Sequence, residues 1–407
     1  MKYRTMGRTG VRVSALGYGC MRYPKKGGRV DEERTRRQIL SLIDGGVNYL
    51  DTAYVYGMGQ SESILGRVLQ EGGRREKVHV ADKVPPQLVF SRADMDKILS
   101  TMLQRLRSDR VDFLLAHALS DFATWARLRS LGYPEFLEQA RREGRIRFAG
   151  FSWHGNTAEF KKVVDDYPWD FCQIQYNYLD EHNQAGKEGL EYAASRGLGV
   201  AVMEPLRGGA LVGRMPREVA EILEGAGVRR SPAAWALDWI WDHPGVSTVL
   251  SGLNEESHVA ENLRLADGSE AGMFADGDRR VVERVREAYG RLLRTGCTGC
   301  GYCMPCPFGV DIPRTFAMQN TLHLFQERQA RVQYTLHATG MAGGVPSKAS
   351  LCRECGKCET HCPQHIPIRE RLKEADRELT VKAMLPAARL LRFIMRKRDR
   401  KAAAEVR

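Results

Sequence analysis

Short apolar runs alternate with amphipathic segments along the first 265 residues of the chain. The runs have the length of strands: VSALGYG, VNYLDTA, VHVADKV, VDFLLAHA, IRFAGFS, FCQIQYNY, LGVAVMEPL and VSTVLSGL. Between them lie segments of helical periodicity, such as the one that Ser91 and Asp94 would cap. Near-continuous apolar strands alternating with helices are typical of a parallel sheet covered by helices. Eight repeats in this length favour a (β/α)8 barrel of the TIM type over an open, doubly wound sheet.

Titratable side chains follow three consecutive predicted strands. Asp51 follows VNYL, Tyr56 lies in the next loop, Lys83 follows VHVAD and His117 follows VDFLLA. Each has an ordinary alternative, because Asp51 could cap a helix, Lys83 could be a solvated charge and His117 could be a satisfied core histidine. The carboxyl ends of barrel strands meet at one rim, where barrel enzymes carry their active sites. Together the four residues therefore predict a catalytic site.

The motifs DTAYVYG, ADK and LLAH resemble the Asp, Tyr, Lys and His tetrad of the aldo/keto reductases, and the resemblance covers residues 1 to 265. It implies a barrel of aldo/keto reductase type that interconverts a small-molecule carbonyl and alcohol with NADPH or NADH. Tyr56 would donate a proton to the carbonyl oxygen, made more acidic by the charge of Lys83. Asp51 would hold Lys83, and neutral His117 would polarise the carbonyl.

The same resemblance implies contacts to the dinucleotide from strand ends and loops. The candidate residues are Gly19, Cys20, Ser152, Gln173, Met203, Pro205, Leu206, Ser251, Gly252, His258 and Asn262. Ser152 and Gln173 match the residues that hold the nicotinamide carboxamide, and Met203 stands where the family usually has a stacking tyrosine. Ser251 and His258 stand near the positions where NADPH-preferring relatives have a lysine and an arginine. The choice between NADH and NADPH therefore stays open.

Eight of the ten cysteines lie between Cys297 and Cys362, in the runs CTGCGYCMPCP and CRECGKCETHCP. The second run has the spacing of a bacterial-type ferredoxin half, whose fourth cysteine ligates the other cluster in two-cluster ferredoxins. The first run is one residue shorter before its fourth cysteine. Zinc is the alternative metal, but zinc sites use cysteine pairs rather than quartets that precede a proline. We expect one [4Fe-4S] cluster on Cys297, Cys300, Cys303 and Cys362, and another on Cys306, Cys352, Cys355 and Cys358.

Helical periodicity continues between the two cysteine runs, in RTFAMQNTLHLFQERQARVQYTLHA. It predicts a small α-helical ferredoxin-like domain that resembles the cluster domains of respiratory iron–sulfur subunits. We expect four parts: a barrel over residues 1–265, a linker and docking helix over 266–295, a two-cluster domain over 296–375, and a basic amphipathic helix over 376–407.

Charge and hydropathy limit the partners. The chain has 62 Lys and Arg against 50 Asp and Glu, a formal net charge of +12. Much of this excess lies in the last 27 residues, so the C-terminal helix would either fold onto its own domain or contact anionic lipid or an acidic partner. No motif indicates nucleic-acid binding. Because no apolar stretch reaches the length of a signal peptide core or a membrane span, we expect a cytoplasmic protein.

Hydride transfer moves two electrons, whereas a [4Fe-4S] cluster normally passes one. A converter such as a flavin would be needed, although the sequence has no flavin motif. The leading hypothesis is an aldo/keto reductase-like oxidoreductase that exchanges electrons with a redox partner protein through two clusters. The alternative is a redox-sensing or electron-carrier subunit whose barrel is a ligand-binding or docking module. A third possibility keeps the enzyme but makes the clusters purely structural.

Overall fold

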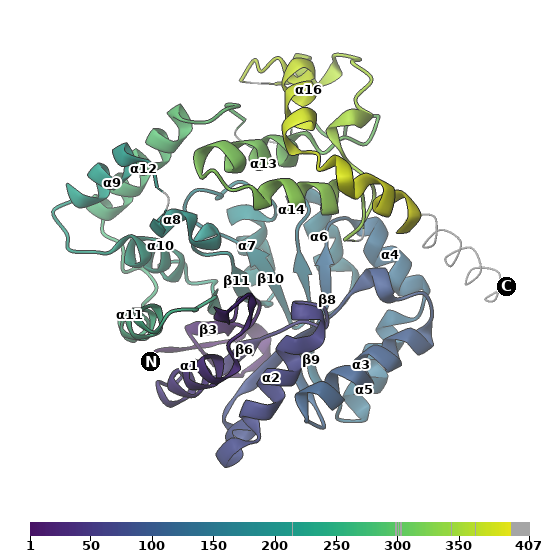
Figure 1. The fold of residues 1–407 in the computed structure, drawn as a ribbon, viewed down its shortest axis with the longest axis vertical. Coiled ribbons are helices and arrows are strands. Elements are labelled where there is room, and N and C mark those ends of the chain that lie inside the picture. Colours follow the sequence, from purple (N-terminus) through teal and green to yellow (C-terminus); the bar gives the residue numbers. More distant parts are fainter. Residues whose placement is uncertain are drawn as a thin grey trace. The chain divides into compact units, whose positions relative to one another are not determined.

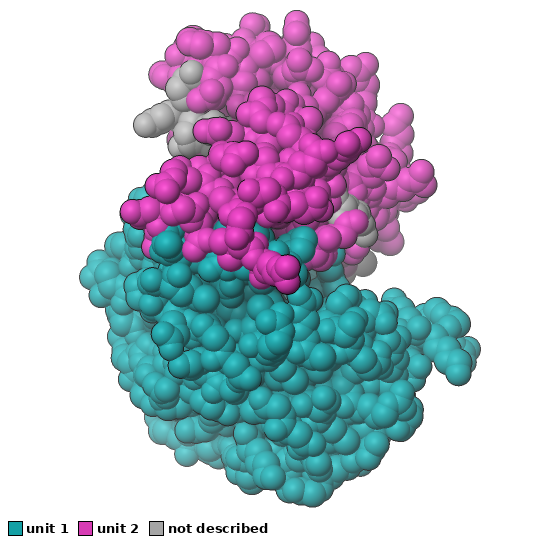
Figure 2. Space-filling model, turned by 90° about the vertical axis from the view of Figure 1, so that its left-hand side faces the viewer, with its two compact units in different colours: residues 1–178, 184–208, 230–275 teal, residues 179–183, 209–229, 276–407 magenta. Residues whose placement is uncertain are grey.

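The computed structural model describes residues 1–213, 215–297, 299, 301, 303–342, 344–362 and 364–391. The chain divides into two compact units (Figure 2). Unit 1 comprises residues 1–178, 184–208 and 230–275, and unit 2 comprises residues 179–183, 209–229 and those from 276 onward. The expected parts were continuous along the chain. That division stays a prediction; in the structure two stretches from the first 265 residues, 179–183 and 209–229, belong to the second compact unit.

Unit 1 is built on eight parallel strands that close into a barrel in the order β10-β11-β12-β3-β6-β7-β8-β9 (Figure 1). Each of the eight predicted runs forms one of these strands, which confirms the (β/α)8 prediction. The strands are β3 (Leu16–Gly19), β6 (Tyr49–Asp51), β7 (His79–Val84), β8 (Val111–Leu119), β9 (Ile146–Trp153), β10 (Phe171–Gln175), β11 (Gly199–Met203) and β12 (Thr248–Ser251).

Helices connect consecutive strands of the barrel. They are α1 (Glu32–Asp44), α2 (Gln60–Leu69), α3 (Arg92–Leu106), α4 (Phe122–Ser130), α5 (Tyr133–Arg142), α6 (Thr157–Asp166), α7 (Gly186–Ser195), α10 (Pro232–Trp241) and α11 (Glu256–Asp267). Ser91 and Asp94 form the predicted capping box of α3, and the Ser231 side chain caps α10. The connection from β8 to β9 uses two helices, α4 and α5. A β4–β5 hairpin (Lys25–Lys26 and Arg29–Val30) extends the loop after β3.

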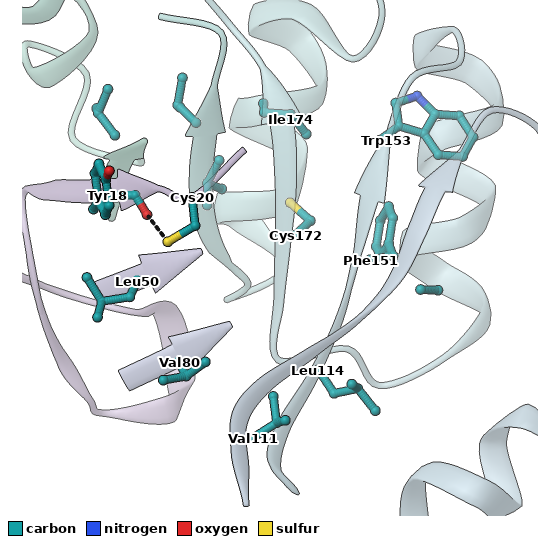
Figure 3. Close-up of a cluster of buried hydrophobic side chains, with 14 of the residues drawn as sticks. Tyr18, Cys20, Leu50, Val80, Val111, Leu114, Phe151, Trp153, Cys172 and Ile174 are labelled. Atoms are coloured by element: carbon teal, nitrogen blue, oxygen red, sulfur yellow. Dashed lines mark hydrogen bonds between the residues drawn. The ribbon is translucent and has the colours of Figure 1, made fainter. Parts of the chain in front are cut away.

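Two layers of apolar side chains stabilise the barrel. The outer layer lies between strands and helices and includes Leu50, Val80, Leu114 and Phe151 (Figure 3). The inner layer fills the barrel with side chains from alternate positions, among them Tyr49, Phe113 and Phe171, together with Met6 and Val13 from the N-terminal hairpin. That hairpin pairs β1 (Tyr3–Thr5) with β2 (Arg12–Ser14). The barrel interior is thus a packed core, and chemistry is confined to its rim.

Unit 2 is mainly helical. Its elements include α8 (Ala210–Gly213), α9 (Arg217–Glu224), α12 (Asp276–Arg291), α13 (Ile312–Leu324), α14 (Gln329–Ala338), α15 (Lys357–Thr360) and α16 (Ile368–Leu379). Helix α9, from the loop after β11, packs against α12. An apolar core beneath the cysteine loops includes Val310, Ile312, Phe316, Ile366 and Leu372.

Two helix boundaries in unit 2 differ from the sequence prediction. The stretch between the cysteine runs forms two helices, α13 and α14, because the chain breaks near Gln326, whose φ is 49°. The chain also leaves the helical conformation after Leu379 and forms a 3-10 turn, η7 (Lys382–Met384). The predicted basic helix over 376–407 is therefore interrupted: residues 376–379 belong to α16, residues 385–391 are helical after η7, and residues 392–407 lie outside the described part of the chain. No helix among the described residues is long and apolar enough to cross a membrane.

Candidate active site and cluster-binding cysteines

The barrel strands bring the four predicted catalytic residues to one rim. Asp51 ends β6, and its neighbour in register on β7 is Ala81, two residues before Lys83. His117 lies near the end of β8, and Tyr56 lies just beyond β6. The Lys83 Nζ atom is 4.9 Å from the centroid of the Tyr56 ring. The rings of Tyr56 and His117 are 5.8 Å apart between centroids and nearly perpendicular, at 77°. The structure thus groups the tetrad that the sequence predicted.

A tight turn orients the Tyr56 side chain toward Lys83 at the end of β7. The Tyr56 amide donates a hydrogen bond to the Ala53 carbonyl, at 2.9 Å. The chain then passes through Gly57 and Met58, both with φ near the left-handed region, at 55° and 56°. A glycine takes this conformation without strain, whereas a methionine rarely does. Such departures collect at functional turns, and this one fixes the direction of the phenol.

Lys83 is fully buried and its ammonium is held by three groups. Its Nζ donates to Asp51 Oδ1 at 2.6 Å and to the Thr52 carbonyl at 2.6 Å. A further hydrogen bond links it to the side chain of Tyr56. Burial alone would lower the pKa of Lys83, but the nearby charges of Asp51 and Tyr56 outweigh it and raise that pKa. The lysine therefore stays an ammonium at neutral pH.

Burial and nearby charge also shift the pKa values of Tyr56 and His117. Burial raises the pKa of Tyr56, while the charge of Lys83 and its hydrogen bond act to lower it. Burial, followed by the charges of Lys83 and His154, holds the pKa of His117 well below its usual value. His117 is therefore a neutral imidazole. At the rim, the phenol of Tyr56 thus lies beside the ammonium of Lys83, and the neutral imidazole of His117 lies close to the phenol.

Buried polar atoms with no partner among the described residues mark a place for a polar ligand. Gln173 donates through Nε2 to the Met203 sulfur at 3.6 Å and leaves its Oε1 without a hydrogen bond. Asn262 donates through Nδ2 to the His258 carbonyl at 2.9 Å and leaves its Oδ1 likewise. The Ser152 hydroxyl oxygen accepts from the Ala118 amide at 2.6 Å, so its own proton remains to be donated. Free acceptors and a free donor suit the amide and amine groups of a nicotinamide dinucleotide.

The remaining predicted cofactor contacts lie at the ends of strands or in the loops that follow them. They are Gly19 at the end of β3, Cys20 after it, Pro205 and Leu206 after β11, Ser251 at the end of β12, Gly252 after it, and His258 in α11. Burial raises the pKa of Cys20 to about 12, so this thiol is neutral. His258 is exposed.

Arg22 is a candidate that the sequence analysis did not name. Its guanidinium nitrogens lie 3.1 and 3.2 Å from the position that a Cβ atom on Gly208 would take. Its Cβ and Cδ lie 3.7 and 3.8 Å from the corresponding position on Gly252. Arg22 thus bridges the loops after β11 and β12 with an exposed cation, a suitable partner for phosphate oxygens. In the sequence, Arg22 follows the first barrel strand by three residues, but no motif distinguishes it from other arginines.

The carboxylates of Glu255 and Glu256 stand at the start of α11, close in sequence to His258. Arg34 donates to both, at 2.5 Å to Glu255 Oε2 and 2.8 Å to Glu256 Oε1. Two carboxylates here share one guanidinium, so this end of the loop is locally acidic rather than basic.

The cysteines of unit 2 surround two cavities. Cys306, Cys352, Cys355 and Cys358 line a cavity of about 290 Å³. Cys297, Cys303 and Cys362 line a smaller one of about 20 Å³, and Cys303 lines both. The fourth predicted ligand of that site, Cys300, lies outside the described residues. Apart from Cys303, which lines both cavities, each described cysteine lies at the cavity of its predicted set, and four thiols around one cavity suit a [4Fe-4S] cluster. Within the described ranges, no three His, Cys, Asp or Glu side chains are placed to hold a single metal ion.

Comparisons with known proteins match two successive parts of the chain to two families. The family model described as Aldo/keto reductase family matches residues 15–269, and the 4Fe-4S dicluster domain model matches residues 296–366. A probable voltage-gated potassium channel subunit beta of Oryza sativa subsp. japonica is 26% identical over 314 residues, covering 66% of this chain and 92% of that protein. L-galactose dehydrogenase of Arabidopsis thaliana is 27% identical over 282 residues, covering 65% and 87% respectively. The solved holo form of aldo-keto reductase AKR11C1 from Bacillus halodurans has a TM-score of 0.59 and 25% identity, covering 70% of this chain and 96% of that one.

Proposed function

Because the chain belongs to the aldo/keto reductase family and carries a 4Fe-4S dicluster domain, we propose that it interconverts a carbonyl and an alcohol by nicotinamide-linked hydride transfer. We propose further that it exchanges electrons with a partner protein through two [4Fe-4S] clusters. The observation that carries the first proposal is the buried ammonium of Lys83, held between Asp51 and Tyr56 beside a neutral His117. A cytoplasmic location is part of the same proposal.

Residues of this chain polarise the substrate carbonyl and donate the proton. A reduced nicotinamide supplies the hydride when it is bound. Tyr56 and His117 hydrogen-bond the carbonyl oxygen of the substrate, and this polarises the carbon toward hydride. As negative charge develops on that oxygen, Tyr56 gives it a proton. The phenolate left behind is stabilised by the ammonium of Lys83, which Asp51 holds in place. In alcohol oxidation the same groups act in reverse.

Three buried groups would hold the dinucleotide. The free Oε1 of Gln173 and the hydroxyl of Ser152 would bind the two ends of the carboxamide, and the free Oδ1 of Asn262 would accept from an amine. Arg22 would meet the phosphate oxygens.

Local charge supports NADH over NADPH. The lysine and arginine that would hold a 2′-phosphate are replaced by Ser251, Gly252 and His258. The carboxylates of Glu255 and Glu256 lie in the same loop and would repel a phosphate group. A ribose hydroxyl is not repelled in this way.

The two cysteine sets would hold the clusters, which supply one-electron storage and transfer when bound. Cys306, Cys352, Cys355 and Cys358 line one cavity, and Cys297, Cys303 and Cys362 line the other. Cys303 borders both cavities, so the two sites adjoin. Neither matched family model supports the flavin that the sequence analysis raised, and the proposal does not include one.

Tyr56→Phe tests the catalytic proposal. Removing the phenolic proton should lower kcat for reduction of small aldehydes by NADH by about 10²- to 10⁴-fold, the usual contribution of a positioned acid. The affinity for NADH should stay unchanged, because the ring remains. Tyr54→Phe is the matched control, since the Tyr54 ring packs under the guanidinium of Arg105 rather than against Lys83. A Tyr56→Phe protein with full aldehyde reductase activity would overturn the assignment.

A second candidate function is that of a docking or redox-sensing subunit. Several similar proteins are described as potassium channel beta subunits, and their names point to a barrel that assembles with another protein. The methionine at position 203, where the family usually has a stacking tyrosine, also favours a looser hold on nicotinamide. A panel of small aldehydes and alcohols separates the two functions. NADH binding without turnover of any member would favour the docking subunit.

A further inference from the structure

One of the two cysteine loops of unit 2 lies at the protein surface. Residues 353–355 are exposed, and among the nine cysteines in the described residues Cys355 alone is exposed. The 290 Å³ cavity that Cys355 lines is bordered also by Phe308, Lys357 and His361. Phe308 is 42% exposed, so an apolar ring stands at the surface beside this cavity. We call the surface formed by Phe308, Arg353, Cys355, Lys357 and His361 the Cys355 face.

The Cys355 face carries uncompensated positive charge. Its neighbouring carboxylates are neutralised, because Glu354 pairs with Lys373 at 2.8 Å and Glu359 pairs with Arg369 at 2.8 Å. Arg353 and Lys357 are exposed and have no ion pair with any described residue. Over residues 351–373 the sequence has five Lys or Arg against three Glu. An aromatic ring beside the cysteines, with cations around it, has the composition of a protein-binding surface.

The other cysteine site has a much smaller cavity, of about 20 Å³. Its cavity is lined by the apolar side chains of Ile312, Phe316, Ile366 and Ile368, and all four belong to the core of the unit. Gly299, in the same cysteine loop, packs on a segment that comes from the barrel sequence. A Cβ atom on Gly299 would lie 3.2 Å from the carbonyl oxygen of His182, in the connection that follows β10. Because Cys355 is the one exposed cysteine among the described residues, the Cys355 face is where an external protein would come nearest to a ligand of the two-cluster region.

We propose that the Cys355 face is the docking site for an acidic one-electron carrier protein. This inference rests on the proposed function in one respect, because it needs clusters on the two cysteine sets. Arg353 and Lys357 would attract the carboxylates of the carrier, and Phe308 would pack against its apolar centre. The carrier loses one electron per encounter to a cluster held by these cysteines, and no atom or proton moves with it. Cys303, which borders both cavities, would bring the second cluster close enough to exchange that electron.

A charge-reversal experiment on the anaerobically purified, cluster-loaded full chain tests this proposal. The double variant Arg353→Glu/Lys357→Glu is compared with Arg280→Glu/Arg284→Glu, which makes the same charge change on exposed positions of α12. The probe is a purified acidic plant-type [2Fe-2S] ferredoxin, and its Kd is measured by titration calorimetry at low and high salt. Iron content is measured for each protein. If the reversal variant fails to load iron, Arg353→Gln/Lys357→Gln replaces it.

We expect the Cys355-face variant to bind the ferredoxin about tenfold more weakly than the wild type at low salt, with the difference shrinking at high salt. The α12 variant should bind as the wild type does. Equal affinity of wild type and Cys355-face variant would overturn the proposal, as would an equal loss in the α12 variant. Binding to phosphatidylserine vesicles in place of the ferredoxin, lost in the same variant, would assign the face to a membrane instead. Because Tyr56→Phe should bind ferredoxin normally, failure of the hydride proposal would be recognised separately.

Discussion

The charge of Lys83 on Tyr56 gives the sharpest prediction about the rim of the barrel. The perturbation is Lys83→Met, which keeps the length of the side chain and removes the ammonium that lies 4.9 Å from the Tyr56 ring centroid. At an effective dielectric constant of about 20, a unit charge at this 4.9 Å distance stabilises a phenolate by about 3.4 kcal/mol, so the pKa of Tyr56 should rise once the charge is gone. If half to all of this difference is felt in the transition state, kcat falls about 20- to 300-fold.

The assay is steady-state aldehyde reduction at saturating NADH over a range of pH. The matched control is Lys97→Met, which removes an exposed lysine from α3. The substitution at position 83 also leaves Asp51 buried without its cation, so thermal unfolding is followed in parallel to show that the protein is folded. The reasoning would be refuted by a folded Lys83→Met protein whose kcat and pH profile match those of the control.

Three further predictions concern a buried acid pair, the dinucleotide site and the clusters. Asp82 and Glu62 are fully buried, and burial raises the pKa of each. A carboxyl group whose pKa is raised in the folded state destabilises the fold as the pH rises above its ordinary pKa, so the Tm of the wild type should fall between pH 5 and pH 8. Asp82→Asn should make this fall smaller. An unchanged fall in the variant would contradict a role of Asp82 in it. Arg22→Ala should weaken NADH binding about tenfold by fluorescence titration, with Arg29→Ala unchanged as control, and equal affinities would exclude a phosphate contact. Cys358→Ser should lose about half of the bound iron and keep NADH affinity, whereas full iron content would remove Cys358 from the ligand set.

The sequence predicted the barrel because its signals are local. Each strand is a run of apolar residues, and the ends of three consecutive strands carry Asp51, Lys83 and His117. Parallel strands bring their carboxyl ends to one rim, so adjacency followed from topology without knowledge of any contact. The grouping of the cysteines could be predicted equally well, because it follows from their spacing in the sequence.

Other features depend on contacts between distant segments and had no local signal. Residues 179–183 and 209–229 look like ordinary barrel loops in sequence, yet they pack with unit 2, for example through an ion pair of Glu181 with Arg286. The break at Gln326 has neither glycine nor proline to mark it. Arg22 matters through the loops it bridges, and Asp82 through its burial beside Glu62. Such roles appear only when the chain is folded.

A crystal structure of the anaerobically purified protein with NADH, phased or checked by the anomalous signal of iron, tests most directly whether one chain joins a hydride site to two clusters. We predict iron density at both cysteine sets and the nicotinamide ring against Tyr56 and His117. Single zinc ions on the cysteines, or a nicotinamide far from Tyr56, would contradict it.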